Sequence, residues 1–366
     1  MPPSPPDVVL HRAARLEDAL NRTAARVLHR RGWRPRVIAY TGYGTPQWVR
    51  VLARVLLAPP GVADRSTVAM RGWRHFVSAK VGGVPLRVQV GDQAQMVESG
   101  RGGYVDVVLP AQLAPGWSQV TVTITGDGDS DAVQAPVRIV GPDERLGIIS
   151  DIDDTVLMTA LPRPLLAFWN TFVRHEESRK PVPGMAELFR TLRAADPDAF
   201  VVYVSTGAWN VAPALRRFMR RLGFPEGPLL LTDWGPTPEG WFRSGQDHKR
   251  ATLRRLVDEF PQLRWVLVGD DGQHDPALYD EIVWARPGDV RMVAVRQLAA
   301  AEQVLTHGLP VPLPSAREPD VHQGDAHQVD VQRAGDSVPR VRGANGHALL
   351  AELRRIGLLD DDTLRP

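Results

Sequence analysis

The spacing of apolar residues divides the chain into parts with different periods. Between residues 36 and 140, apolar and polar residues alternate, which is the period of a strand with one buried face. The alternation is clearest in two runs: Leu86, Val88 and Val90, then Val120, Val122 and Ile124. Turn-forming sequences such as GDGDSD at 126–131 separate the runs. Several short strands with turns between them predict an antiparallel, β-sandwich-like domain over 36–140.

A different pattern begins near residue 141, where continuous apolar runs are followed by helical patterns. The apolar runs predict strands at 146–149, 200–204, 229–231, 265–268 and 292–295. The polar and apolar spacing between them predicts helices at 210–222 and 247–260, the second capped by Asp247. Alternating strands and helices are typical of a parallel sheet. We therefore expect a Rossmann-like α/β domain over 141–309.

The two ends of the chain carry separate signals. Residues 1–35 hold an apolar stripe at helical spacing opposite an Arg-rich face, which predicts an amphipathic helix. Such a helix packs its stripe on a neighbouring domain or lies on an anionic membrane, and the sequence leaves both open. Residues 310–366 are rich in Pro, Gly, His and Asp, which predicts a disordered tail. Within it, 346–359 has the pattern of one short helix.

Composition narrows the classes of function. Of the 366 residues 43% are hydrophobic, as in ordinary globular proteins, and the net charge of +2 gives no electrostatic case for nucleic acid binding. The absence of Cys excludes disulfides, thiol catalysis and Cys-zinc sites. No apolar run is long enough for a transmembrane segment. The first residues lack a secretory hydrophobic core, so we expect a cytoplasmic protein.

The sequence LGIISDIDDT at 146–155 places acidic residues directly after a buried strand. In an extended backbone the carboxylates of Asp151 and Asp153 point the same way, and they repel by about 4 kcal/mol at ~4 Å and an effective dielectric of ~20. Mg²⁺ offsets such repulsion because it binds carboxylate and phosphate oxygens. This favours a metal-assisted site with Asp151 as nucleophile and Asp153 as acid and base. Taken alone, the stretch is equally consistent with a solvated turn or a helix cap.

Polar residues also follow the later strands or begin later helices. Ser205 follows one strand, Lys249 lies near the start of a helix, and Asp270, Asp271 and Asp275 follow another strand. Phosphoryl transfer depends mostly on positioning and on stabilising negative charge. Ser205 would donate a hydrogen bond to the phosphoryl group and Lys249 would supply positive charge. Asp270 would complete the Mg²⁺ shell, with Asp271 or Asp275 as its partner.

The order of these groups carries a family resemblance. DxDxT, a strand-end Ser, a Lys and then GDD with a further Asp resemble the haloacid dehalogenase superfamily. More narrowly, SDIDDTVLMT, YVSTGAWN, DHKRATL and LVGDDGQHDPALY are similar to the actin-patch-type phosphatidate phosphatases, which are related to the lipin catalytic domain. The similarity covers roughly 147–308. It implies a Rossmann-like fold, a β-rich amino-terminal domain in bacterial relatives, and Mg²⁺-dependent hydrolysis of phosphatidate to diacylglycerol and phosphate.

The resemblance also implies roles for individual residues. We expect metal binding by Asp151, Asp153, Asp270, Asp271 and Asp275 and substrate binding by Thr155, Thr206, Gly207 and Trp209. Two short sequences depart from the family's usual pattern. The chain has STGAW at 205–209 where the family often has SNSPW, and GDD at 269–271 where it often has GDS. Neither departure removes a catalytic group.

Three functions stay open at this point. The first is a lipid phosphate phosphatase, the second a phosphatase of a soluble phosphomonoester, and the third a non-catalytic phosphatidate-binding module. The presence of both Asp151 and Asp153 argues against the third. The span 156–183 is too short for a large lid and contains Phe168, Trp169 and Phe172, which either rim the pocket or belong to the core. A lipid substrate implies transient contact with the inner membrane face, while the oligomeric state is undetermined.

Overall fold

The computed structural model describes residues 23, 26–59, 81–126, 132–158, 180–232, 244–272, 274–299, 302 and 338–359. These residues form two compact units, one made of the residues up to Pro142 together with Ser244, and the other of the remaining residues from Asp143 onward. Most of the amphipathic helix predicted over 1–35 lies outside the described residues, as do the aromatic residues of the 156–183 span. Among the described helices, none is both long and apolar enough to cross a membrane.

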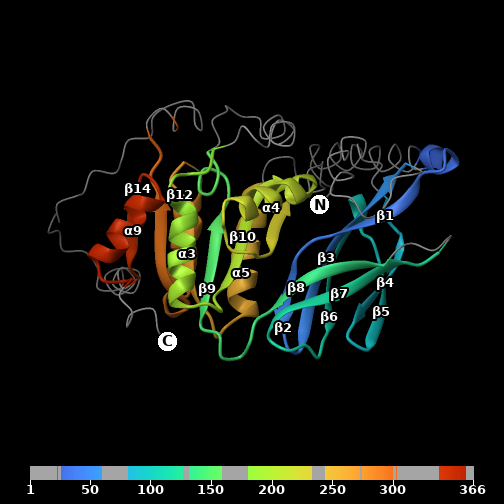
Figure 1. The fold of residues 1–366 in the computed structure, drawn as a ribbon, viewed down its shortest axis with the longest axis horizontal. Helices are drawn as coiled ribbons and strands as arrows, with labels where there is room; N and C mark the ends of the chain where they lie inside the picture. The colour runs from blue at the N-terminus through green and yellow to red at the C-terminus, as the bar shows by residue number, and fades with distance from the viewer. Residues whose placement is uncertain are drawn as a thin grey trace, which may run out of the picture. The chain divides into compact units, whose positions relative to one another are not determined.

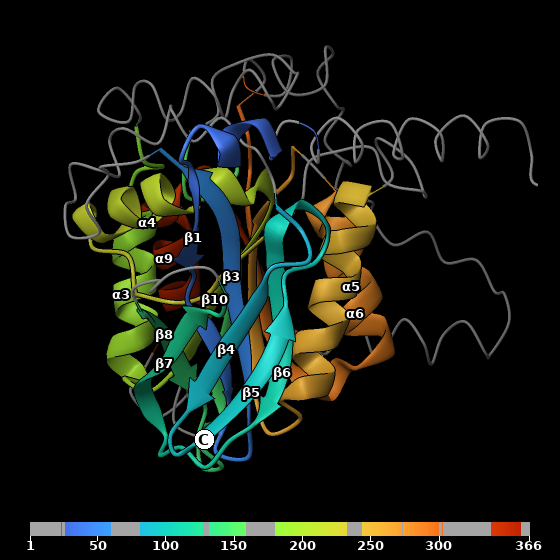
Figure 2. The same ribbon diagram turned by 90° about the vertical axis from the view of Figure 1, so that its right-hand side faces the viewer.

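The first unit is a sheet of eight strands, with β6 paired to β3 beside the path β1-β3-β2-β8-β7-β4-β5 (Figure 2). Every pairing is antiparallel except that of β2 with β8. The sheet folds over so that β1 also lies against β7 and β8. The strands are β1 (Arg34–Ala39), β2 (Gly42–Thr45), β3 (Trp48–Ala58), β4 (Pro85–Val90), β5 (Gln93–Glu98), β6 (Tyr104–Pro110), β7 (Gly116–Ile124) and β8 (Val133–Ile139).

The alternating residues form the core of this unit. On β4, Leu86, Val88 and Val90 are buried while Pro85 and Arg87 are exposed. They join the buried residues of β3, β6, β7 and β8 in one apolar cluster. The prediction of a mostly antiparallel, sandwich-like unit is confirmed. The parallel β2–β8 pair was not predicted, because the period of a strand does not depend on the direction of its partner.

The second unit is a six-stranded sheet with all strands parallel, in the order β11-β10-β9-β12-β13-β14 (Figure 1). Helices α3 and α9 pack on one face of this sheet and α5 and α6 on the other (Figure 2). The strands are β9 (Leu146–Asp151), β10 (Phe200–Ala208), β11 (Leu229–Thr232), β12 (Arg264–Asp270), β13 (Val290–Arg296) and β14 (Arg340–Gly343). The helices are α3 (Met185–Ala195), α4 (Ala212–Arg221), α5 (Ser244–Glu259), α6 (Asp275–Ala285) and α9 (Gly346–Arg355). The predicted Rossmann-like α/β architecture is confirmed.

The central strands β9 and β12 lie in close contact. All residues of β9 are buried, and a Cβ at Gly147 would lie 2.4 Å from the indole of Trp265 on β12. Any larger residue at position 147 would therefore force these strands apart. The tight pairing fixes the height at which each strand ends, and so the positions of the polar residues that follow.

Two elements differ from the sequence expectation. Helix α5 begins at Ser244, so Asp247 lies inside its first turn and does not cap it. Residues 340–343, predicted as part of a disordered tail, form the edge strand β14 beside β13. The four residues alternate Arg with Val and Gly, which gives too short an apolar pattern to predict a strand. The predicted short helix at 346–359 corresponds to α9, capped by the side chain of Asn345, which accepts a hydrogen bond from the Ala348 N–H at 3.0 Å.

Candidate active site

Three neighbouring parallel strands bring their polar ends to the same edge of the sheet. Asp151 ends β9 and is paired in register with Val204 of β10, so Ser205 lies one residue further on. On the other side, Ser150 pairs with Val268, and Asp270 ends β12 two residues later. The sequence placed these groups after successive strands, and the register shows that they meet. This is the edge at which open α/β sheets bind ligands.

Three carboxylates form the centre of the site. Asp151, Asp270 and Asp275 are each at most 1% exposed, and one oxygen from each lies within 4.8 Å of the others. Asp275 is the first residue of α6, which follows β12 after a short loop. Gly269 leaves space for it, because a Cβ there would lie 2.5 Å from Asp275 Oδ2. The glycine before Asp270 therefore allows the two acids to approach.

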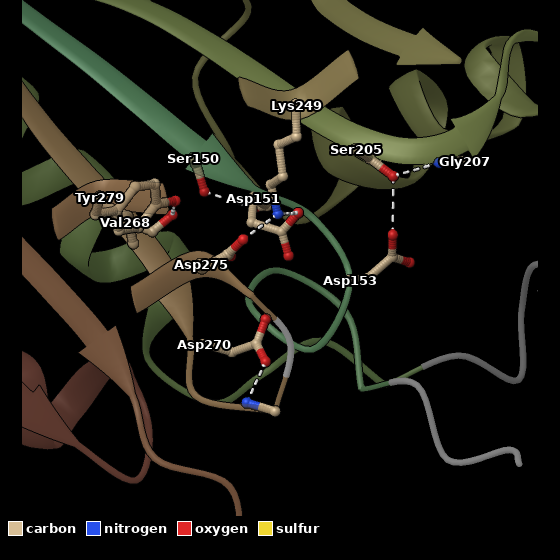
Figure 3. A network of polar contacts seen from close by, with 11 residues as sticks. Ser150, Asp151, Asp153, Ser205, Gly207, Lys249, Val268, Asp270, Asp275 and Tyr279 are labelled. Atoms are coloured by element: carbon tan, nitrogen blue, oxygen red, sulfur yellow. Dashed lines mark hydrogen bonds and ion pairs between the residues drawn. The ribbon is translucent and has the colours of Figure 1, made fainter. Parts of the chain in front are cut away.

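Lys249 enters this cluster from α5 and bridges two of its members (Figure 3). Its ammonium donates to Asp151 Oδ1 at 2.7 Å and also to Asp275 Oδ1, and the residue is 3% exposed. Because α5 begins at Ser244, Lys249 lies in the second turn of the helix, whereas a helix beginning at residue 247, as predicted, would have it in the first turn. Its positive charge therefore acts mainly through these direct contacts.

The cluster has the charge and the free oxygens that a divalent cation requires. Three carboxylates against one ammonium leave two negative charges without compensation. Among the described residues, Oδ2 of Asp151, Asp270 and Asp275 and Oδ1 of Asp153 are buried and accept no hydrogen bond. Buried carboxylate oxygens of this kind are costly unless a cation or a donor meets them. Hard oxygen donors suit Mg²⁺, Ca²⁺ or Mn²⁺, so the residues present fit a metal ion of this class.

Burial dominates the electrostatics of the acids. It raises the pKa of Asp151 well above its usual value; Lys249 opposes this shift, while Asp275, Asp270 and Asp153 add to it. Burial likewise raises the pKa of Asp270, and the carboxylate of Asp275 contributes. For Lys249, burial alone would lower the pKa, but the ion pairs with Asp151 and Asp275 outweigh it and raise the pKa above its usual range. The cluster therefore favours any added positive charge.

Asp153 faces away from the three-carboxylate cluster, toward β10 (Figure 3). The hydroxyl of Ser205 donates to Asp153 Oδ2 at 2.8 Å and accepts from the Gly207 N–H at 2.9 Å. Burial raises the pKa of Asp153 from 3.8 to about 6, with the hydrogen bond from Ser205 opposing the shift. A carboxyl with a pKa near 6 is suited to both donating and accepting a proton near neutral pH.

The other predicted site residues lie around this centre. Thr155 is fully buried, and its hydroxyl has no hydrogen-bond partner among the described residues. Thr206 and Trp209 are partly buried at and just after the end of β10, and the carbonyl of Thr206 accepts from the Thr232 hydroxyl at 2.7 Å. Asp271 is turned away from the cluster, since its Oδ1 accepts the Leu298 N–H at 2.8 Å. The sequence left open whether Asp271 or Asp275 is the partner of Asp270 in the metal site, and the geometry favours Asp275.

The structure adds two residues that the sequence analysis did not name. Tyr279 lies one turn after Asp275 on α6 and donates its hydroxyl to the Val268 carbonyl at 2.8 Å, which ties this helix to β12. Arg296, at the end of β13, donates to the carbonyl of Asp154 at 2.6 Å. Arg296 had a sequence signal, because it is the first polar side chain after the apolar run that predicted the fifth strand.

Comparison with known proteins bears on this arrangement. Residues 146–297 match the family model described as the catalytic domain of phosphatidate phosphatase APP1. This segment is therefore similar to the APP1 catalytic domain. The resemblance inferred from the motifs is confirmed for this segment, which includes every predicted site residue.

Individual relatives are more distant. The chain is 25% identical over 234 residues to phosphatidate phosphatase APP1 of Saccharomyces cerevisiae, covering 60% of this chain and 39% of the relative. It is 23% identical over 199 residues to an uncharacterized protein of Schizosaccharomyces pombe, covering 53% of this chain and 33% of the relative. The chain therefore spans well under half the length of either. Among solved structures, the HAD domain of effector protein Lem4 from Legionella pneumophila matches with 12% identity and a TM-score of 0.28, covering 42% of this chain and 85% of that one.

Proposed function

We propose that this chain hydrolyses phosphatidate to diacylglycerol and phosphate through a phosphoryl group carried on Asp151. The observation that supports the proposal is the meeting of Asp151, Asp153 and Lys249 at one strand edge, inside the segment that matches the APP1-type domain. A structural role for so many buried acids is unfavourable, because uncompensated carboxylates oppose folding.

The metal in this proposal is Mg²⁺, held by Asp151, Asp270 and Asp275. These are the three acids with mutually close oxygens, each with an oxygen that accepts no hydrogen bond within the described residues. When bound, Mg²⁺ neutralises charge on the phosphoryl oxygens and orients them for in-line attack. Asp153 offers a further unpaired oxygen, whereas Asp271 is engaged by the backbone of Leu298.

In the first step, Asp151 attacks phosphorus and the bond between phosphorus and the glycerol oxygen breaks. Asp153 donates its proton to that oxygen, which leaves as the hydroxyl of diacylglycerol. The raised pKa of Asp153, about 6, keeps a useful fraction protonated near neutral pH. Lys249 neutralises part of the charge on Asp151 and on the transferred group, while its own contact with Asp275 holds it in place.

In the second step, the ionised Asp153 takes a proton from water, and the water oxygen attacks phosphorus. The bond between phosphorus and Asp151 breaks, releasing phosphate and restoring the carboxylate. Ser205 has one hydroxyl hydrogen, which it donates to Asp153 in this structure. When Asp153 is protonated it is a weaker acceptor, so Ser205 can turn this hydrogen to a phosphoryl oxygen, the role expected from the sequence.

The test is a phosphate-release assay with Mg²⁺ that compares phosphatidate in mixed micelles with soluble phosphomonoesters. The expected result is turnover of phosphatidate that disappears in Asp151→Asn, a variant that keeps the volume and removes the nucleophile. Turnover of soluble sugar or nucleotide phosphates with none of phosphatidate would overturn the lipid assignment and keep the chemistry. Binding of phosphatidate vesicles without any turnover would instead identify a non-catalytic module.

A further inference from the structure

Arg296 is fixed by its backbone to the acidic end of the neighbouring strand. It is the last residue of β13, paired in register with Asp270 on one side and with Gly343 on the other. Its carbonyl accepts the Asp271 N–H at 2.9 Å. The main chain of Arg296 is therefore hydrogen-bonded to the residue that directly follows Asp270.

The side chain of Arg296 reaches three acceptors from separate parts of the chain. Nη1 donates to the Asp154 carbonyl at 2.6 Å, Nη2 to Glu302 Oε1 at 2.7 Å, and Nε to the Ala344 carbonyl at 3.1 Å. The residue is 3% exposed. A guanidinium holds several donors in one plane, so one Arg can join three acceptors that the smaller ammonium of Lys would not span. Glu302 balances its charge, and the two carbonyls accept from two of its other N–H groups.

Asp154 needs such support. Within the described residues it is the one non-glycine residue with a positive φ, 55°. A side chain disfavours this left-handed conformation, so it persists only where the surroundings hold it. Asp154 directly follows Asp153, and its conformation sets the direction in which the chain leaves the strand. The hydrogen bond from Arg296 to its carbonyl fixes that direction.

We infer that Arg296 is a positioning residue, which holds the loop of Asp151 and Asp153 at a set distance from Asp270. The expected effect of Arg296 on turnover rests on the proposed function. Its effect on the acidic cluster does not depend on the substrate. Ala344 lies beyond the 146–297 segment that matches the APP1-type domain, between β14 and α9. The carboxyl-terminal elements thus form a second anchor for the same arginine.

The first test is a double-mutant cycle between Arg296→Lys and Asp154→Gly in the full chain. Arg296→Lys should lower kcat about tenfold or more with KM changed by less than about twofold, since misplacement by ~1 Å costs up to a hundredfold. Glycine adopts a positive φ readily, so the loop depends less on Arg296 in the Asp154→Gly background. There the same substitution should lower kcat several-fold less. Equal losses in the two backgrounds would mean that Arg296 acts only as part of the core, and would overturn the inference.

The second test does not require turnover. The melting temperature is followed as Mg²⁺ is added to the chelator-treated protein, and the concentration for half the rise is measured. For Arg296→Lys it should increase about tenfold, because partners that orient metal ligands typically change affinity by 10- to 100-fold. Arg296→Gln, which retains one amide donor, should behave the same way. A concentration unchanged in both variants would contradict the inference.

Arg340→Ala is the matched control. Arg340 lies on β14 of the same carboxyl-terminal segment, and its side chain pairs with the exposed Asp280, which is not among the partners of Arg296. This variant should leave unchanged both kcat and the Mg²⁺ concentration that gives half the rise in melting temperature. Changes as large as those of Arg296→Lys would show that the loss of any Arg in this region has the same effect, and would contradict the inference. If the wild type releases no phosphate from phosphatidate while the Mg²⁺ dependence shifts as expected, the proposed function fails and the positioning role stands.

Discussion

Lys249 is the residue on which the charge balance of the site depends. It is a buried cation between Asp151 and Asp275. Asp270 lies close to both acids, but none of the ion pairs of the described residues joins it to a cation of the chain. Removing one partner of a buried pair leaves the other charge uncompensated, which is more destabilising than replacing both. Lys249 therefore has two separable effects, one on turnover and one on stability.

Lys249→Ala should lower kcat/KM by about 3 kcal/mol, roughly a hundredfold, by analogy with the loss of one charge-stabilising donor. Lys249→Arg should restore little, because the planar guanidinium does not fit between the two carboxylates held by the compact ammonium. Steady-state kinetics on phosphatidate measure this. Lys180→Ala, which alters an exposed lysine, is the control, and near-normal rates for Lys249→Ala would remove Lys249 from the mechanism.

Asp153 should make the metal-free protein less stable as the pH rises. Its pKa increases from 3.8 in the unfolded chain to about 6 in the folded protein, mainly through burial. Below both values each state is protonated and the group has no effect; above both, the folded state holds a buried charge. The destabilisation therefore develops as the pH rises from about 4 to about 6, and the difference in pKa corresponds to about 3 kcal/mol.

Asp153→Asn removes this charge and keeps an oxygen that can accept the Ser205 hydrogen bond. In excess chelator, its free energy of unfolding should match that of the wild type near pH 4 and exceed it by up to about 3 kcal/mol at pH 7. Urea titrations at several pH values measure the difference. A difference that stays constant with pH would contradict the assigned shift.

At the scale of elements, strand ends determine the site and were largely predictable. The apolar runs before Asp151, Ser205 and Asp270 fix where each strand stops, and parallel pairing brings those ends together. The sequence could not decide between Asp271 and Asp275, because both follow β12 within a few residues. The decision depends on where α6 begins, which places Asp275 over the cluster and leaves Asp271 to the backbone of Leu298.

The carboxyl-terminal strand β14 shows what the sequence pattern could not predict. Strand β14 has four residues and only two that are buried, so its period is too short to detect. What fixes it is non-local, namely the register with β13 and the packing of α9 beside α3. The partners of Arg296 could not be predicted for the same reason, because Asp154 and Ala344 are distant from it in sequence.

The packing of α9 leads to a prediction for this segment. Leu349, Leu350 and Leu353 are at most 2% exposed. Leu349→Ala should lower the free energy of unfolding of the catalytic unit by about 2–5 kcal/mol, through lost burial and the cavity left behind. Glu352→Ala, which removes a partly exposed carboxylate paired with the exposed Arg355, should change it by less than about 0.5 kcal/mol. Equal stability of Leu349→Ala and wild type would mean that α9 does not pack on the sheet in solution.

At the scale of the whole molecule, the chain joins a β-rich unit to the α/β unit that carries the acidic site. The kind of substrate determines whether the protein acts at a lipid surface or in water. A diacylated phosphate stays in a lipid surface, since each CH₂ moved into water costs about 0.8 kcal/mol. If phosphatidate is the substrate, diluting it with inert detergent within micelles at constant bulk concentration should lower the rate. A rate that depends only on bulk concentration would indicate that the enzyme takes its substrate from water.

Metal removal leads to a further prediction at this scale. A phosphate monoester brings roughly −1.5 to −2 charges to a site that already holds an excess of carboxylates. Without a cation it should not bind, so a chelator should abolish phosphate release and Mg²⁺ should restore it. The melting temperature should rise with Mg²⁺ as well, because the ion binds the folded cluster and not the dispersed acids of the unfolded chain. Full activity in excess chelator would exclude the metal.

The central claim is that Asp151 carries the phosphoryl group, and trapping that group tests it most directly. The enzyme is mixed with phosphatidate labelled in its phosphate, quenched in acid within one turnover, digested, and the labelled peptide is identified. The account predicts a hydroxylamine-sensitive label on Asp151 that is absent from Asp151→Asn. A label on any other residue, or phosphate release by Asp151→Asn at the wild-type rate, would contradict it.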